Sequence, residues 1–109
     1  MIVFSVLFLV GLGDAMAETP VDPERGANLY KANCAACHGQ ALDGKGPAGA
    51  ALKPAPSNFK DQQFWTDRDE KSVKAGIKNG KPGTAMMAFA HLIDEDVESI
   101  VAYLMANKP

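Results

Sequence analysis

The sequence predicts a small domain built from α-helices. Apolar residues recur at helical spacing in three segments, which begin near residues 22, 66 and 94. The sequence lacks the strand–helix–strand pattern of a βαβ unit. The 109 residues contain no internal repeat, and their number fits one domain. We therefore expect one helical domain, preceded by a short targeting segment.

Residues 1–17 have the features of an export signal. Residues 2–10 are almost wholly apolar, and Ala15 and Ala17 place small side chains at the −3 and −1 positions of a cleavage site. The apolar run is too short to cross a bilayer as a permanent helix. Because no Lys or Arg precedes it, retention as an anchor is an alternative to cleavage. We expect a cleavable signal peptide over residues 1–17 and a mature domain over residues 18–109.

The first predicted helix opens at Asp22 and Pro23. Aspartate is a good N-cap, and proline suits the first helical position, where no N–H is needed. One face of this helix carries four residues at helical spacing: Gly26, Leu29, Tyr30 and Cys34. Since glycine lowers helix propensity, Gly26 either meets a close packing partner or is merely tolerated.

Residues 39–59 are a predicted loop, because they contain four glycines and three prolines. A loop of this length in a compact domain usually serves a site. The apolar side chains of Leu42, Leu52 and Phe59 argue against a flexible linker. We expect these three side chains to lie against a bound apolar group.

Two further helices follow the loop. Thr66 is the expected N-cap of the second, with Asp69 as its capping-box partner, and Asn79-Gly80 ends this helix. Its expected buried face consists of Val73, Gly76 and Ile77. The third helix begins at Asp94. Its apolar stripe is the most regular in the chain and consists of Val97, Ile100, Val101 and Leu104.

The stretch from Cys34 to His38, Cys-Ala-Ala-Cys-His, is the most informative in the sequence. Two cysteines at this spacing, followed directly by histidine, are typical of covalent attachment of a c-type haem. The thiols add across the two vinyl groups on one edge of the porphyrin, and the short spacer keeps both sulfurs at that edge. The adjacent imidazole then lies beneath the iron as proximal ligand. The motif assigns Cys34 and Cys37 to the thioether bonds and His38 to the iron.

A redox dithiol and a small metal clip are the alternative interpretations of this motif. A thioredoxin-like dithiol would need a βαβ context, and a zinc site would need further Cys or His ligands. Cys34 and Cys37 are the only cysteines, and the only other histidine is His91. Haem attachment is therefore favoured. Because residues 18–109 leave little room for a core of side chains alone, we expect haem attachment and folding to be coupled.

Residues 22–107 resemble a class I cytochrome c. The motifs that carry the resemblance are, in chain order, Gly26-x-x-x-Tyr30, Cys34-x-x-Cys37-His38-Gly39, Gly44-Lys45-Gly46-Pro47, Gly83-Thr84-Ala85-Met86-x-x-Phe89 and Ala102-Tyr103-Leu104. The haem motif alone specifies the cofactor. The methionine in its Gly-to-Phe frame, followed by an amphipathic helix, specifies the class. The resemblance implies one covalently attached haem c per chain.

The family implies an all-α fold in which the N- and C-terminal helices cross and Gly26 lets Tyr103 or a neighbour approach closely. It implies that the Pro47 carbonyl accepts a hydrogen bond from the His38 Nδ1–H, which orients the ring and strengthens its donation to iron. It also implies Met86 as the distal iron ligand.

Met87 and His91 are the other candidates for the distal position. The family frame places the ligand three residues before Phe89, which selects Met86. At the next position, where proline is frequent in the family, this sequence has Met87. The loop is then less rigid, and slippage of the ligand to Met87 is an alternative. We expect Met87 to be an apolar filler and His91 a solvated group.

His/Met ligation leaves no open iron position for oxygen or peroxide. This favours a low-spin, one-electron carrier that is not an enzyme, with redox proteins docking near the exposed haem edge. The alternative function is the haem c subunit of a periplasmic dehydrogenase or oxidase complex. A five-coordinate peroxidase or gas sensor fits less well with a methionine at position 86. Export and the haem motif together indicate the periplasm of a Gram-negative bacterium.

The net charge of −2 favours neither nucleic acid nor a strongly anionic surface as partner, but the charge is unevenly distributed. Residues 44–93 carry eight basic and four acidic side chains, whereas residues 94–109 carry four acidic and one basic. We expect an acidic partner surface to meet the basic segment, with an attraction that salt weakens. An ordinary solvated helix face is the alternative. Trp65 either contacts a haem propionate or packs under the loop.

Overall fold

The computed structural model of the protein describes Val3 and residues 20–109. Within these residues the chain forms helices and no strands: α1 (Pro23–Asn33), α2 (Ala35–His38), α3 (Gln62–Thr66), α4 (Glu70–Asn79) and α5 (Asp94–Ala106). The all-α prediction is confirmed. Except for Val3, the predicted export signal lies outside the described residues. None of the helices described has the length and apolar character that crossing a membrane requires.

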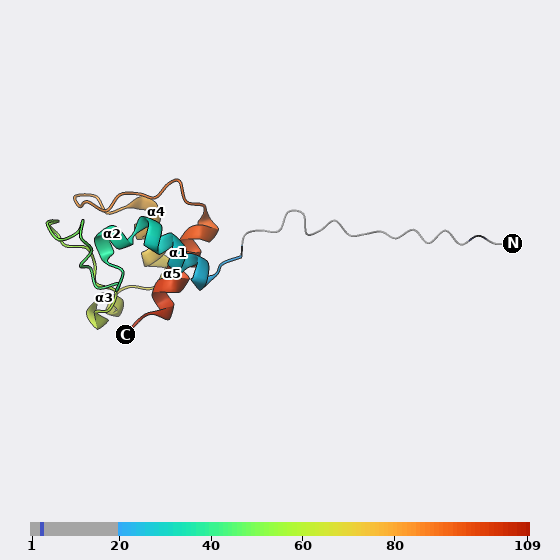
Figure 1. The fold of residues 1–109 in the computed structure, drawn as a ribbon, viewed down its shortest axis with the longest axis horizontal. Coiled ribbons are helices and arrows are strands. Elements are labelled where there is room, and N and C mark those ends of the chain that lie inside the picture. The colour runs from blue at the N-terminus through green and yellow to red at the C-terminus, as the bar shows by residue number, and fades with distance from the viewer. Residues whose placement is uncertain (1–2, 4–19) are drawn as a thin grey trace.

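Helices α1 and α5, from the two ends of the domain, pack directly against each other (Figure 1). Gly26 of α1 lies against the backbone of α5, where a Cβ atom would come within 1.8 Å of the Ser99 carbonyl oxygen. The close packing partner expected for Gly26 therefore exists, and it is Ser99. The fully buried Ser99 hydroxyl also accepts a hydrogen bond from the Asp22 N–H at 3.1 Å. An ion pair between Arg25 and Asp96 adds a contact beside this crossing point.

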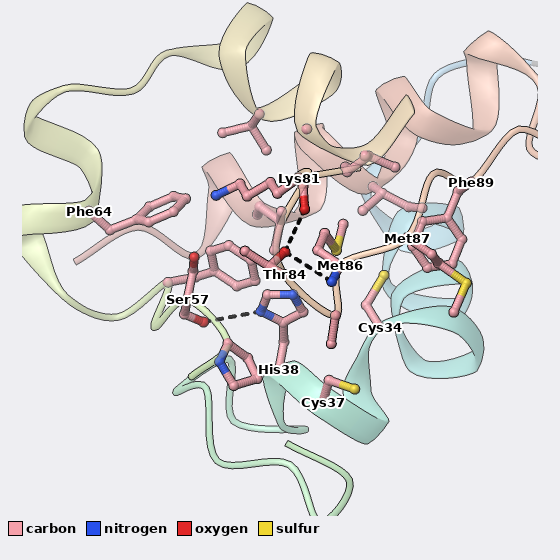
Figure 2. A pocket seen from close by; sticks show the side chains of 18 of the residues that line it. Cys34, Cys37, His38, Ser57, Phe64, Lys81, Thr84, Met86, Met87 and Phe89 are labelled. Atoms are coloured by element: carbon pink, nitrogen blue, oxygen red, sulfur yellow. Dashed lines mark hydrogen bonds between the residues drawn. The ribbon is translucent and has the colours of Figure 1, made fainter. Parts of the chain in front are cut away.

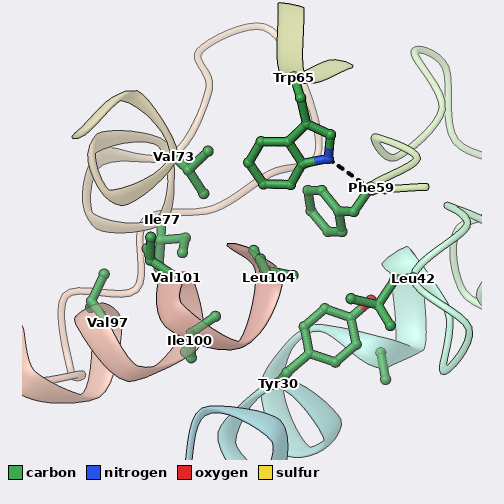
Figure 3. Close-up of a cluster of buried hydrophobic side chains, with 11 residues drawn as sticks. Tyr30, Leu42, Phe59, Trp65, Val73, Ile77, Val97, Ile100, Val101 and Leu104 are labelled. Atoms are coloured by element: carbon green, nitrogen blue, oxygen red, sulfur yellow. Dashed lines mark hydrogen bonds between the residues drawn. The ribbon is translucent and has the colours of Figure 1, made fainter. Parts of the chain in front are cut away.

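The apolar stripe of α5 forms the centre of the core (Figure 3). Its members are between 0% and 5% exposed, as the periodicity predicted: Val97, Ile100, Val101 and Leu104. Side chains from every other helix pack around this stripe, among them Tyr30 of α1 and Val73 and Ile77 of α4. The core therefore joins segments that are far apart in the sequence.

Asp69, and not Thr66, is the N-cap of α4. Its side chain accepts a hydrogen bond from the Ser72 N–H at 2.9 Å, and the Ser72 hydroxyl accepts one from the Asp69 N–H at 3.0 Å. The hydrogen bond from the Ser72 N–H to its carboxylate is the main cause of the lowered pKa of Asp69. The prediction that Thr66 caps this helix was wrong, because aspartate is at least as good a cap as threonine and serine can complete the box. Thr66 instead ends α3, a short helix capped by Asp61 that the sequence pattern did not predict.

The chain turns sharply after α4 and folds back over its C-terminal end. Gly80, which follows the last residue of α4, has a φ of 69°, a left-handed conformation that favours glycine. A Cβ atom at Gly80 would come within 2.8 Å of the Met86 carbonyl oxygen and the Ala88 nitrogen. The Phe89 N–H donates to the Ile77 carbonyl at 3.0 Å. The segment from residue 81 to residue 89 is thus fixed against α4 at both ends.

The Gly26→Ala variant tests the contact between α1 and α5. The added methyl group would overlap with backbone atoms of Ser99, which no side-chain rotation relieves, so the helices must separate. We expect the free energy of unfolding to fall by about 3 kcal/mol, the upper end of the usual cost of overpacking. Denaturant unfolding of the haem-loaded protein measures it. Asn28→Ala, on the exposed side of the same helix, is the matched control and should change stability by less than about 0.5 kcal/mol. Equal midpoints for the two variants would contradict this account.

Candidate haem site

A cavity of about 340 Å³ lies among the five helices and the two long connections between them. Cys34, Cys37 and His38 line it from the end of α1 and from α2, and Met86 lines it from the segment after α4 (Figure 2). Most of the remaining lining residues are apolar, including Ile77 and Leu104. The structure thus brings both predicted thioether cysteines and both predicted iron ligands to one cavity.

The haem motif folds into a single helical turn. The His38 and Cys37 N–H groups both donate to the Cys34 carbonyl, at 2.9 and 3.2 Å. Residues three and four positions apart share one face of a helix, so both thiols and the imidazole face the cavity together. Gly39, with a φ of 87°, ends the turn. The residue spacing alone thus accounts for the arrangement of the three groups.

The imidazole of His38 is held from two sides. Its Nδ1 lies 3.1 Å from the Ser57 carbonyl oxygen and donates to it, because a carbonyl can only accept. The ring of Phe59 stacks against it, with the ring centres 4.8 Å apart. Burial lowers the pKa of His38, the hydrogen bond to Ser57 opposes this effect, and the charge of Lys81 adds to it. The ring is therefore neutral at pH 7, with an unprotonated Nε2, the form that binds a metal ion.

Ser57, and not Pro47, orients this histidine, so the expectation for Pro47 was wrong. Pro47 is exposed, and its neighbours are occupied elsewhere: the Gly46 N–H donates to the Cys37 carbonyl at 3.0 Å, and the Ala48 N–H to the Ala36 carbonyl at 2.8 Å. These bonds hold the start of the loop on the backbone of α2. The later part of the same loop reaches the edge of the imidazole and supplies the carbonyl.

The environment of the two cysteines argues against a redox dithiol. Burial raises the pKa of Cys34 to about 11, and the neighbouring Cys37 adds to the rise. A reactive dithiol needs a lowered pKa, because the thiolate is the nucleophile. A metal clip is also disfavoured, since the described residues contain no group of three Cys, His, Asp or Glu side chains that could hold a metal ion.

The three candidates for the distal ligand differ in position. Met86 is half-buried and lines the cavity, whereas Met87 lines its rim and is 65% exposed. His91 is exposed and does not line the cavity. The Thr84 hydroxyl, whose role sequence reasoning missed, donates to the Lys81 carbonyl at 2.7 Å and accepts from the Met86 N–H at 3.2 Å. This brace fixes the backbone that carries Met86.

Trp65 packs beneath the loop. It is 6% exposed, its Nε1–H donates to the Phe59 carbonyl at 2.8 Å, and it does not line the cavity. Of the loop residues expected to contact the bound group, Leu52 and Phe59 line the cavity, while Leu42 is buried in the core away from it. Trp65 therefore supports the loop that carries Phe59, the residue that stacks on the proximal histidine.

Two cations at the cavity were not assigned to the site from the sequence. Arg68 and Lys81 both line it. Burial lowers the pKa of Lys81, and the charge of Arg68 adds to this effect. Arg68 is one of the eight basic residues of the segment 44–93, and only the structure shows that its side chain reaches the cavity.

The residues present fit a covalently attached haem. The two thiols lie on one wall, a neutral imidazole presents a free nitrogen, a thioether lies in the segment after α4, and the remaining walls are largely apolar. The donor set of two cysteines, one histidine and one methionine is the one that c-type haem uses.

Comparison with known proteins identifies the family. The family model described as cytochrome C oxidase, cbb3-type, subunit III matches residues 21–104. The chain belongs to this family. It is a class I mono-haem cytochrome c, an electron-transfer protein and not an enzyme in its own right. Membership implies a covalently attached haem c, and the chain has the Cys-x-x-Cys pair, Cys34 and Cys37.

Individual relatives agree with this assignment. Cytochrome c6 of Bryopsis maxima is 30% identical over 79% of this chain and 92% of its own length. The crystal structure of cytochrome c6 from the diatom Phaeodactylum tricornutum, 32% identical, superposes with a TM-score of 0.57 over 78% of this chain and 92% of that chain.

Other similar proteins are longer than this chain. It is 27% identical over 86% of its length to cytochrome c oxidase subunit 2 of Alkalihalophilus pseudofirmus, but it spans only 29% of that subunit. A chain of the reducing HAO-like protein complex of Kuenenia stuttgartiensis, 26% identical, superposes with a TM-score of 0.71 over 84% of this chain and 46% of that chain. The same domain therefore occurs both as a small protein and as part of larger chains.

Tyr30 couples the haem motif to the core, and Tyr30→Phe tests this coupling. Its buried hydroxyl donates to the carbonyl of Gly39, the residue after His38, at 2.6 Å, and burial with the nearby Cys34 raises its pKa. Removal of the hydroxyl leaves the Gly39 carbonyl with one remaining donor, the Leu42 N–H at 3.1 Å, so we expect the loss of one ordinary hydrogen bond, about 1 kcal/mol in the free energy of unfolding. Tyr103→Phe, at the half-buried neighbouring ring, should cost less than about 0.5 kcal/mol. Denaturant unfolding compares them, and equal losses would refute the assigned role.

Proposed function

We propose that the protein carries single electrons on one low-spin haem c with His38 and Met86 as its axial ligands. The observation that supports this most directly is that His38 and Met86 line the same cavity from different elements, α2 and the segment after α4, with both cysteines beside His38 (Figure 2). When bound, a haem supplies an iron atom that changes its charge by one electron.

The residues of the chain determine how this group is held. Ser57 keeps Nδ1 of His38 protonated, so Nε2 is available to the iron, and the Phe59 ring limits rotation of the imidazole. The Thr84 brace holds Met86 at the cavity. With both axial positions filled by side chains, there is no open position for oxygen or peroxide, and the ligands need to move little when the charge changes. Both features suit electron transfer.

Partner proteins dock, in this proposal, near the cavity rim where Met87 is exposed. The basic segment offers less free charge than its sequence indicates, because Lys74 pairs with Glu98 and Lys78 pairs with Asp94. These pairs join α4 to α5. They neutralise part of the positive charge of residues 44–93 and part of the negative charge of residues 94–109. Steering by charge would therefore depend on the remaining basic residues, and salt-dependent rates remain its test.

The alternative function is that of a haem c subunit in a larger periplasmic dehydrogenase or oxidase complex. It is supported by the family description, which names an oxidase subunit, and by the longer relatives of which this domain is one part. Both functions use the same site, so the oligomeric state distinguishes them.

Fractionation of the native host separates the two functions and also tests export. We expect the protein in the periplasmic fraction, with the molecular mass of a chain that begins at Glu18. On a size-exclusion column it should elute as a small protein that is not part of a complex. Co-elution with a larger complex would favour the subunit function. If the protein is found in the membrane fraction with its N-terminal segment intact, that segment is an anchor and not a cleaved signal peptide.

The Met86→Ala variant tests the distal ligand. It should open the sixth iron position, remove the weak far-red ferric absorption band that marks Met–Fe ligation, and lower the reduction potential, because the thioether favours ferrous iron. Met87→Ala, at the adjacent methionine, should leave the spectrum nearly unchanged. Optical spectra in both redox states decide the outcome. If Met87→Ala alone removes the band, Met87 is the ligand, and if the wild type lacks the band, the site is not His/Met.

A further inference from the structure

Two cations face the cavity without a carboxylate partner. Arg68 and Lys81 both line it, and neither takes part in the ion pairs between side chains of the described residues. Arg68 lies over the ring of Phe64, with its central carbon 4.5 Å from the ring centre, and donates to the Phe64 carbonyl at 3.2 Å. Both residues are exposed, but their like charges repel each other at the cavity. An anion bound between them would offset this repulsion.

The cysteines determine where such an anion would lie. A haem carries its two vinyl groups on one edge and its two propionate groups on the opposite edge. Because Cys34 and Cys37 bind the vinyl edge, the carboxylates must lie at the end of the cavity that is remote from them. The Lys81 ammonium group points toward Phe64, away from both cysteines (Figure 2), and Arg68 lies over that same ring.

The backbone fixes both cations at this end. Arg68 stands between α3 and α4, where its bond to the Phe64 carbonyl anchors the guanidinium. Lys81 follows the turn at Gly80, and its side chain passes Gly76, where a Cβ atom would lie 3.8 Å from its Cε. The N–H of Lys81 donates to the Met86 carbonyl at 3.1 Å.

We propose that Arg68 and Lys81 form a binding site for the two haem propionates. Arginine presents a planar fork of donors that suits a carboxylate, and lysine adds a second charge. The inference rests on haem attachment in the proposed function and is independent of which residue is the distal ligand. Since Lys81 lies on the segment that carries Met86, the site also links the propionate end of the haem to the distal segment.

Resonance Raman spectra of the haem-loaded protein test this proposal. The bending mode of the propionate groups reports their hydrogen bonding, and it should shift to lower frequency in Arg68→Gln and in Lys81→Gln, with a larger shift in the double variant. The reduction potential should fall as well, because loss of a positive charge near the iron favours the ferric state. Arg68→Lys, which keeps the charge and loses the fork, should give a smaller shift than Arg68→Gln.

Lys71→Gln is the matched control. Lys71 is an exposed lysine of α4 that does not line the cavity, so its loss should leave the propionate mode unchanged. An unchanged mode in Lys81→Gln and in the double variant would overturn the proposal. If Arg68→Gln folds poorly, Lys81→Gln alone still tests the proposal, because Lys81 is exposed and outside the core. The proposed function has a separate test, the optical spectrum of the wild-type protein. If that spectrum shows no covalent haem, the proposed function is refuted.

Discussion

The close backbone contact between Gly26 and Ser99 is the constraint on which the rest of the structure depends. It lets α1 lie directly on α5, so the end of α1, where Cys34 begins the haem motif, is fixed beside the apolar stripe of α5. That stripe then faces both the core and the cavity, since Ile100 and Leu104 contribute to both. A side chain at position 26 would move the cysteine wall away from the opposite walls. The geometry of the site is therefore set by a contact at the far end of α1.

The cavity belongs to the core as much as to the surface. Helices α1, α4 and α5 and both long connections contribute residues to it, and its walls are largely apolar. A small domain has too little interior to be stable through side chains alone, so an apolar group bound at this place adds buried surface where the elements meet. This is the physical reason to expect that haem attachment and folding support each other. It also explains how short helices such as α2 and α3 can keep fixed positions in so small a chain.

Local sequence patterns predicted the parts of the fold that depend on local physics. Asp22 and Pro23 at the start of α1 and the apolar stripe of α5 follow from capping and spacing, and the structure contains both. One prediction failed for a local reason, because competition between nearby capping residues moved the start of α4 from Thr66 to Asp69. The others depend on the three-dimensional path of the chain, since the direction of a loop carbonyl decided between Pro47 and Ser57. The reach of Arg68 into the cavity likewise depends on where α3 and α4 are placed.

The two sides of the proposed haem site differ in how firmly they are held. His38 lies on a helical turn anchored to the core through Tyr30. Its ring donates a hydrogen bond to the Ser57 carbonyl and stacks against Phe59. Met86 lies on a connection that is exposed over much of its length and is held by the Thr84 hydroxyl, Lys81 and a bond to α4. Segments with few buried contacts open at lower free energy than core segments. The distal segment is therefore where the site can rearrange while the proximal side stays in place, and a propionate contact at Lys81 would restrain that segment.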